Sequence, residues 1–417
     1  MKPTLAVVGT GMAGMSAAYF LKDDFEVTVF EKNDYVGGHT NTVYVSEEDR
    51  QIPIDTGFMV FNEETYPLMC RLFKKLDVPY HDTSMSFCVY DYNRAFEYNG
   101  GSFGDLFTQK KNAISPSFWK MLIDIYRFGK GVPRYLSEPE FDGISLGDLI
   151  KREGLGDGFT DDYLLPMTAA VWSTPHYEML RFPARTMIRF LQNHGLTGID
   201  TQHQWKTVEK GSETYKQKLI ATFRDRIKTN AKVTKVHRAN GKAVVTLNDG
   251  TENIFDKVVL ASHADETREI LQSPTPLEKE LLAPFHYQKN EAWLHTDSSI
   301  MPKIKRNWSS WNQVQRDGER FTVYYMNYLQ PISKKIDYFI NINGTQFIDE
   351  KKVIKKITYH HPLFGVETEK AQRRLHELNQ KDGVIQFCGA WFRYGFHEDA
   401  LMSSVQMCQN LLGREVL

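Results

Sequence analysis

The first 31 residues constrain the fold of this chain more than any other segment. Residues 5–8 form a short apolar run typical of a buried strand, and the glycine-rich turn 9–14 follows it directly. A helical pattern continues to residue 21, and a second strand pattern at 26–30 ends in Glu31. Strand, glycine turn, helix, strand and acid in this order predict a βαβ unit that binds a dinucleotide.

The glycines of this turn have separate roles in such a unit. Gly9 permits the tight turn, Gly11 lets the backbone approach a pyrophosphate, and Gly14 lets the helix pack on the strand. The helix N-terminus presents free N–H groups to the phosphates, and Glu31 stands where a carboxylate accepts the ribose hydroxyls. A plain structural glycine turn is the alternative. The predicted contacts are Gly9, Gly11, Met12, Ala13, Gly14, Glu31 and Lys32.

The residues after Glu31 favour FAD over a nicotinamide cofactor. The run 37–40, Gly-Gly-His-Thr, resembles the second glycine pair of FAD-binding flavoproteins, where the chain passes close to the ligand. A strand pattern from residue 52 then enters a turn at Gly57, which in those proteins brings backbone to the flavin ring. A plain hairpin is the alternative for this second segment. We expect FAD contacts from Gly37, Gly38, His39, Thr40, Gly57, Phe58 and Met59.

The last forty residues indicate a return to the same cofactor. Residues 384–390 indicate a strand that enters a glycine turn, and residues 396–401 open a final helix. A helix N-terminus at this place would stabilise negative charge on the reduced flavin, although an ordinary last helix is the alternative. The contacts expected here are Gly389, Ala390, Glu398, Asp399 and Ala400.

The pattern between these segments predicts an α/β fold with two domains. Residues 63–211 are mainly helical in pattern, which indicates an inserted helical cap, and strand-like runs between 271 and 380 suggest a second sheet. We expect a Rossmann-like FAD-binding domain of the glutathione-reductase type at 1–62, 208–272 and 381–417. Residues 63–207 and 273–380 should form a substrate-binding domain with a mixed sheet and the helical cap.

Composition excludes several classes of protein. Lys and Arg total 51 against 52 for Asp and Glu, so the net charge of −1 gives no global field that would attract nucleic acid. The four cysteines form no C-x-x-C pair, and no apolar run approaches the ~18 residues of a membrane span. We expect a cytoplasmic protein with reduced thiols, peripheral to the inner membrane face at most, and no metal site. The oligomeric state stays open.

Seven segments resemble one protein superfamily. They are residues 37–40, 55–58, 171–175, 190–196, 204–208, 290–297 and 387–401. Together they resemble the flavin-containing amine oxidase and phytoene desaturase superfamily, and most closely a bacterial branch described as predicted NAD/FAD-binding or FAD-dependent amine oxidoreductase. This branch is associated with enzymes that modify fatty acyl chains, so the resemblance implies FAD and a small apolar or lipid-like substrate. It also places Val233 against the adenine.

The chain departs from the superfamily pattern at three positions. His39 and Ala390 stand where the superfamily usually has Arg and Glu, so backbone and helix dipole should meet most of the phosphate charge. Amine oxidases place a lysine near flavin N5 on a strand that looks like 290–296 here, but only Lys289 lies nearby, just outside it. Amine oxidation is therefore in doubt.

Few residues are needed for flavin chemistry, because the flavin itself takes the hydride from an activated C–H bond. His397 is the first candidate for a base or a ring contact, with a helix-capping histidine as the alternative, and Phe396 and Tyr394 should wall the flavin. His194 or Arg181 could hold a substrate carboxylate, and Trp311 and Tyr325 are further pocket candidates. The substrate contacts that we predict are Trp172, Trp205, Trp293, Tyr324 and Asn327.

These features predict an FAD-dependent oxidoreductase that removes a hydride from an apolar, methylated or unsaturated fatty acyl substrate. An amine oxidase, an FAD-dependent double-bond isomerase and a non-catalytic FAD-binding partner protein are the alternatives. Aromatic and apolar residues at 117–135 indicate that the cap covers an apolar tunnel. If one face of this helix is exposed, with Lys120, Arg127 and Lys130 at its rim, it could dock on a membrane. The small number of basic residues favours a buried face instead.

Overall fold

A parallel five-stranded sheet carries the N-terminal glycine turn. The computed structural model describes residues 1–172, 176–196 and 203–417. The strand order is β19-β13-β1-β2-β9, and every neighbouring pair is parallel. The strands are β1 (Thr4–Val8), β2 (Glu26–Phe30), β9 (Ile227–Lys228), β13 (Lys257–Leu260) and β19 (Ile385–Phe387). The mixed α/β fold expected from the sequence is confirmed.

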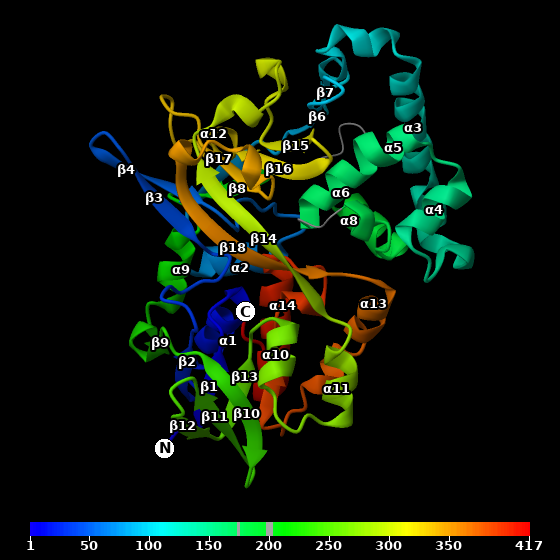
Figure 1. Cartoon of the computed structure of the whole chain (residues 1–417). Coiled ribbons are helices and arrows are strands. Elements are labelled where there is room, and N and C mark those ends of the chain that lie inside the picture. The colour runs from blue at the N-terminus through cyan, green and yellow to red at the C-terminus, as the bar shows by residue number, and fades with distance from the viewer. Residues whose placement is uncertain (173–175, 197–202) are drawn as a thin grey trace.

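Two helices far apart in the sequence cover one face of this sheet together. Helix α1 (Met12–Leu21) and helix α14 (His397–Leu412) lie in one hydrophobic cluster, next to each other in the lower half of Figure 1. A Cβ atom on Gly14 would lie 2.0 Å from the carbonyl oxygen of Gly9, so only glycine permits this helix to start so close to β1. An antiparallel sheet of three strands packs against the other face of the parallel sheet through a separate hydrophobic cluster. Its strands are β10 (Val233–Ala239), β11 (Lys242–Leu247) and β12 (Glu252–Phe255).

A second, seven-stranded sheet has the order β18-β14-β17-β16-β15-β6-β7, and it is mixed because β15 and β6 run parallel. Its strands are β6 (Phe87–Asp91), β7 (Phe96–Asn99), β14 (His286–His295), β15 (Trp311–Arg316), β16 (Glu319–Tyr325), β17 (Phe339–Ile342) and β18 (Val353–Leu363). The interpretation of residues 63–211 as mainly helical missed β6 and β7. It also missed the pair β5 (Tyr80–Thr83) and β8 (Trp205–Val208). The domain boundaries remain our proposal.

The helical cap stands beside the second sheet, at the upper right of Figure 1. Its longest helix, α3 (Pro116–Ser137), begins where the Ser115 hydroxyl accepts a hydrogen bond from the Phe118 N–H and Pro116 follows. The other cap helices are α4 (Leu146–Glu153), α5 (Asp157–Phe159), α6 (Leu165–Trp172), α7 (His176–Met179) and α8 (Ala184–Asn193). They share a core of their own with aromatic side chains at its centre.

Shorter elements complete the chain. They are the hairpin β3 (Thr42–Glu47) and β4 (Arg50–Asp55), and the helices α2 (Pro67–Lys75), α9 (Glu213–Ile220), α10 (Ala264–Ile270), α11 (Pro276–Leu282), α12 (Met326–Leu329) and α13 (Val366–Gln372). The hairpin packs its Ile52 and Ile54 against the second sheet. Among the helices of the described residues, none is long and apolar enough to cross a bilayer.

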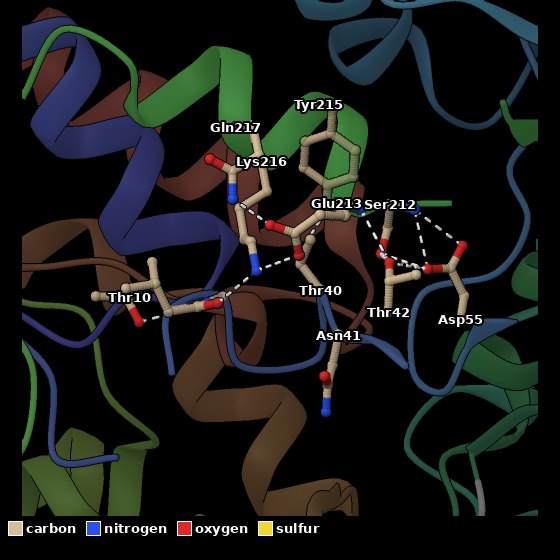
Figure 2. A network of polar contacts seen from close by, with 12 residues as sticks. Thr10, Thr40, Asn41, Thr42, Asp55, Ser212, Glu213, Tyr215, Lys216 and Gln217 are labelled. Carbon is tan, nitrogen blue, oxygen red and sulfur yellow. Dashed lines mark hydrogen bonds and ion pairs between the residues drawn. The ribbon is translucent and has the colours of Figure 1, made fainter. Parts of the chain in front are cut away.

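A buried carboxylate ties the hairpin to α9. Asp55 accepts hydrogen bonds from the Thr42 hydroxyl at 2.6 Å, the Ser212 N–H at 2.9 Å and the Ser212 hydroxyl at 2.7 Å (Figure 2). The side-chain amide of Gln330, which directly follows α12, donates to the other carboxylate oxygen of Asp55 at 2.7 Å. Burial raises the pKa of Asp55, and these four donors oppose that shift. The carboxylate therefore fixes the segment that follows the Gly37-Gly38 turn.

Replacement of Asp55 should destabilise the protein. Asp55→Ala leaves the Ser212 N–H and the Gln330 amide without an acceptor in a dry site, so we expect a loss of about 2–3 kcal/mol in the free energy of unfolding. Urea denaturation measures this loss in the free energy of unfolding. The matched variant Asp382→Ala changes an exposed aspartate and should stay within about 0.5 kcal/mol of the wild type. Equal effects of the two substitutions would contradict the role of this network.

Candidate functional site

A large cavity of about 1790 Å³ runs between the parallel sheet, the second sheet and the cap. It exceeds the ~300–1000 Å³ of a pocket for one small molecule, so it has room for a dinucleotide and a further ligand. One end is lined by the glycine turn and by Val233, and the other end by residues of α3. The cavity therefore joins the predicted cofactor site to the cap.

Most of the predicted cofactor residues line the cavity. They are Gly9, Gly11, Met12, Ala13, Glu31, Lys32, Gly38, His39, Gly57, Phe58, Met59, Val233, Gly389, Ala390 and Ala400. These residues come from widely separated parts of the chain, which the fold brings to one place. Their contact with the cofactor itself stays a prediction.

Five of the predicted cofactor residues do not line the cavity. Gly14 and Gly37 are required by close backbone packing, since a Cβ atom on Gly37 would lie 2.4 Å from the Thr40 carbonyl oxygen. Glu398 accepts hydrogen bonds from the N–H groups of residues 68 and 69 at the start of α2, each at 2.9 Å. Asp399 accepts from the N–H groups of residues 394 and 396. Their role is to position the walls of the cavity.

Thr40, the fifth, lies behind the wall. Its hydroxyl is 2.5 Å from the Tyr215 hydroxyl and 3.2 Å from His397 Nε2. Figure 2 shows Thr40 and Tyr215 facing each other between the turn and α9. Lys216 on the same helix donates to the Val36 carbonyl at 2.9 Å. Helix α9 thus holds the second glycine turn in place from outside the cavity.

The N-terminus of α1 fits a pyrophosphate. No side chain caps this end and its first turn holds no acidic residue, so its N–H groups are free for an anion. A Cβ atom on Gly11 would meet nothing within 4 Å, and a Cβ atom on Gly38 would lie 3.4 Å from the Gly11 Cα. The two glycine turns therefore form an open cradle that a side chain would fill. This is the geometry that close approach of a phosphate requires.

Two polar side chains complete the fit to FAD. The Glu31 carboxylate is held by the Thr10 N–H at 3.1 Å and the Asn33 N–H at 2.9 Å, and its oxygens can accept further bonds from ribose hydroxyls. His39 stacks on Tyr359 with ring centroids 4.5 Å apart, and its buried Nε2 atom has no hydrogen-bond partner among the described residues. A bound ligand would satisfy this atom, so the residues present fit the cofactor.

Neutral imidazoles line the middle of the cavity. Burial lowers the pKa of His397 to about 3 and that of His361 to about 4, and the pKa of His39 is also well below its usual range. His263 and His360 lie in the same wall of the cavity, and their proximity further lowers the pKa of His361. The His361 Nδ1 atom is 2.7 Å from the Asn290 amide nitrogen, which a neutral ring can accept from. The rings of His39, His361 and His397 are therefore polar contacts without charge near pH 7.

The three catalytic candidates come together at the start of α14. The His397 ring stacks on Phe58 with a centroid distance of 4.0 Å, and Phe396 stacks on Phe190 of the cap at 5.1 Å. The Trp172 indole N–H donates to the Tyr394 carbonyl at 3.0 Å. All three candidates line the cavity. The final loop and the cap therefore form one continuous aromatic wall.

Three of the five predicted substrate residues, Trp172, Trp205 and Tyr324, line the cavity, as do His194 and Trp311. Three residues of the matched segment 171–175, Ser173, Thr174 and Pro175, lie outside the described residues.

Trp293 and Asn327 do not line the cavity, which corrects their predicted role. Side chains alternate along β14, so Ala292 and Leu294 pack on the cavity side while Trp293 packs on the opposite face, under the Lys356 ammonium at 4.0 Å. The Asn327 amide donates to the carbonyls of residues 333 and 336 and shapes a loop. Tyr325 also packs on the far face, and exposed Arg181 pairs with Glu178.

Sequence reasoning missed two groups of lining residues. The first is the end of β18, where Tyr359, His360 and His361 face the cofactor end of the cavity. The adjacent histidines were the only signal for it. The second is a set of apolar and aromatic residues from the cap and its flanks: Met85, Phe87, Tyr98, Phe103, Leu106, Trp119, Leu122, Ile123, Tyr126, Tyr163 and Met167. Their aromatic content indicated the cap, but not which of them face inward.

Comparisons with known proteins agree with this geometry. The family model described as flavin containing amine oxidoreductase matches residues 12–292. Beta-cyclopiazonate dehydrogenase of Aspergillus flavus is 30% identical over 159 residues, which cover 36% of this chain and 32% of that protein. The chain thus spans about a third of the length of this curated relative.

Solved structures share the fold over nearly the whole chain. Cyclohexylamine oxidase from Brevibacterium oxydans IH-35A superposes with a TM-score of 0.71 at 14% identity, covering 99% of this chain and 100% of its own. The CLA-producing fatty acid isomerase from P. acnes superposes with a TM-score of 0.66 at 15% identity, covering 96% and 97%. At such low identity these likenesses show the fold alone.

Gly11→Ala tests the cradle without disturbing the fold. The added methyl group meets no protein atom within 4 Å, but it would occupy the space of the pyrophosphate. We expect FAD to bind at least about tenfold more weakly, by titration of the FAD-free protein, with the thermal unfolding of that FAD-free protein unchanged. Gly365→Ala, whose Cβ atom also meets nothing, is the control and should bind FAD normally. Full FAD affinity in Gly11→Ala would refute the assignment.

The stability of the protein should fall as the pH is lowered. His361 has a pKa of about 4 when folded and about 6.5 when unfolded, so acid favours the unfolded chain. Between about pH 7 and about pH 5 this one group should remove about 2 kcal/mol. Urea denaturation at both values should show a smaller loss for His361→Gln than for the wild type. Equal losses would mean that His361 titrates normally.

Proposed function

Because this chain belongs to the flavin-containing amine oxidoreductase family and uses FAD, we propose that it dehydrogenates an apolar, fatty acyl substrate. The family membership makes it an FAD-dependent oxidoreductase. The proposal concerns the substrate. It holds that a hydride leaves a C–H bond beside a double bond or carbonyl, and that a proton leaves the neighbouring carbon, so that a new double bond forms.

The proposal rests on the charge of the cavity wall. We call the lining residues from Tyr66 to Trp205, together with Trp311, Tyr324 and Ile342, the substrate section. Among the described residues of this section there is no aspartate or glutamate, and its one cation is Lys130 at the α3 end. The carboxylates of the cavity, Glu31, Glu266 and Glu269, all lie at the nucleotide end. A protonated amine would be desolvated here without a counter-charge, whereas an acyl chain would not.

Two hydrogen-bond donors in this section suit an acyl carbonyl. Trp311 is buried, and its indole N–H has no partner among the described residues. Tyr324 stacks parallel to it with centroids 6.3 Å apart, and burial raises the pKa of its hydroxyl, which keeps the proton on the oxygen. Both groups donate, so the pair complements an oxygen acceptor in apolar surroundings.

The residues around α14 would orient the substrate and take its proton. Bound FAD supplies the hydride acceptor. Burial lowers the pKa of the neutral His397 imidazole to about 3, so this ring is a weak base. Its Nδ1 atom would accept the substrate's proton only transiently, with the Nε2 atom donating to Thr40 3.2 Å away, and would pass the proton to water. Phe58 fixes the plane of this ring, and Phe396 with Phe190 keeps water out. Each of these roles is a proposal.

Anaerobic mixing of the FAD-loaded protein with candidate substrates tests the proposal. Unsaturated or methylated acyl lipids should bleach the flavin absorption band, because no oxygen is present to reoxidise it. Tyr324→Phe should raise the half-saturating lipid concentration about tenfold by loss of one hydrogen bond, and the effect should be absent for a hydrocarbon that lacks the carbonyl.

Three other outcomes would overturn the proposal. Bleaching by amines alone would indicate an amine oxidase, the activity named for the Brevibacterium structure. A rearranged double bond without lasting bleaching would indicate an isomerase, as named for the P. acnes structure. No response to any lipid or amine would favour a binding role.

A further inference from the structure

One face of helix α3 is apolar and exposed. Trp119, Ile123 and Tyr126 are spaced four and three residues apart, so they lie on one face, and they are 42%, 57% and 64% exposed. The opposite side of the helix, with Phe118 and Phe128, is buried in the cap core. The buried face favoured from the sequence is therefore found for Phe118 and Phe128, but the face with Trp119, Ile123 and Tyr126 is exposed. An aromatic chain through Phe107 links Trp119 to exposed Phe103.

We call Phe103, Trp119, Ile123 and Tyr126 the α3 face. All four residues also line the cavity. The exposed apolar surface and the apolar wall of the interior are therefore continuous. In Figure 1, α3 is the cyan helix at the outer edge of the cap, at the end of the molecule away from β1 and α10. A ligand could pass from this surface to the substrate section without crossing water.

The surroundings of the α3 face are basic. Residues 101–137 contain Lys110, Lys111, Lys120, Arg127, Lys130 and Arg134 against only Asp105 and Asp124. Asp105 pairs with Arg306 at 3.1 Å, and buried Asp124 pairs with Arg127 at 2.8 Å. Lys110 and Lys120 are exposed and have no ion pair among the residues with described positions. A chain whose net charge is −1 thus concentrates positive charge around the exposed α3 face.

We propose that the α3 face docks on the surface of an anionic lipid bilayer and receives the acyl substrate from it. The proposal rests on the function proposed above. Trp and Tyr side chains favour the boundary between headgroups and acyl chains, and Lys side chains around them pair with anionic headgroups. The helix lies along the bilayer surface and does not cross it. The substrate then enters the cavity alongside Trp119, Ile123 and Tyr126, which line both the surface and the cavity.

Vesicle co-sedimentation of the FAD-loaded protein tests the docking. The protein should sediment with vesicles of phosphatidylcholine and phosphatidylglycerol at low salt, and much less with phosphatidylcholine alone or at high salt. Ile123→Ser should reduce binding at least tenfold with FAD content and thermal unfolding unchanged. The matched control is Ile254→Ser, which changes a side chain that is 65% exposed on β12 and should bind as the wild type does.

A charge variant tests the second part of the proposal. The double variant Lys110→Gln/Lys120→Gln should lose most of the salt-dependent binding. The double variant Lys355→Gln/Lys381→Gln, with the same change in net charge, should keep it. Equal losses in the two double variants would mean that binding depends on net charge alone, which would overturn a docking face at α3.

Two further results would also overturn the docking. One is the absence of binding to anionic vesicles at low salt. The other is a concentration-dependent dimer that Ile123→Ser dissociates, because the α3 face would then be an interface between copies. These two results differ from the results that would contradict the proposed function. Docking without flavin bleaching by acyl lipids would contradict that function alone, and bleaching by detergent-dispersed lipid without docking would contradict the membrane surface alone.

Discussion

The close packing of α1 on the turn after β1 is the constraint on which the rest of the site depends. A Cβ atom on Gly14 would lie 2.0 Å from the Gly9 carbonyl oxygen, so the helix packs directly on the turn after β1. Its N-terminus therefore opens directly onto the cavity. Because no side chain caps that end, its N–H groups stay available to an anion. The second glycine turn, held by Asp55 and α9, closes the cradle from the other side.

The chemistry of the cavity depends on how charge is distributed over its described walls, since the substrate section has no aspartate or glutamate among those residues. Backbone N–H groups and a helix dipole are available to phosphates, while burial keeps the imidazoles of His361 and His397 neutral. The substrate section has aromatic walls, and Trp311 and Tyr324 are among its hydrogen-bond donors. On the function proposed above, such a wall would select a substrate by its shape and by a hydrogen-bonded oxygen.

The cofactor half could be predicted from the sequence because its signals are local. The βαβ unit needs only strand, glycine and helix patterns within 31 residues, and its turn lines the cavity as expected. The substrate half depends on long-range pairing. The face of β14 that carries Trp293 is decided by β17 and β18, and the partners of Glu398 lie at α2, more than 300 residues away in sequence. Burial, which sets the pKa of His397, has no signal in a single sequence.

The pairing of α1 with α14 has a consequence for the order of folding. The two helices stand at residues 12–21 and 397–412, and they share one hydrophobic cluster. Contacts between segments so distant in sequence cost loop-closure entropy, which slows the folding of α/β proteins relative to helical bundles. Local hairpins such as β10–β11 can form early, whereas the floor of the cavity assembles late. Capture of FAD would then be among the last events of folding, and free FAD would accelerate mainly the final step.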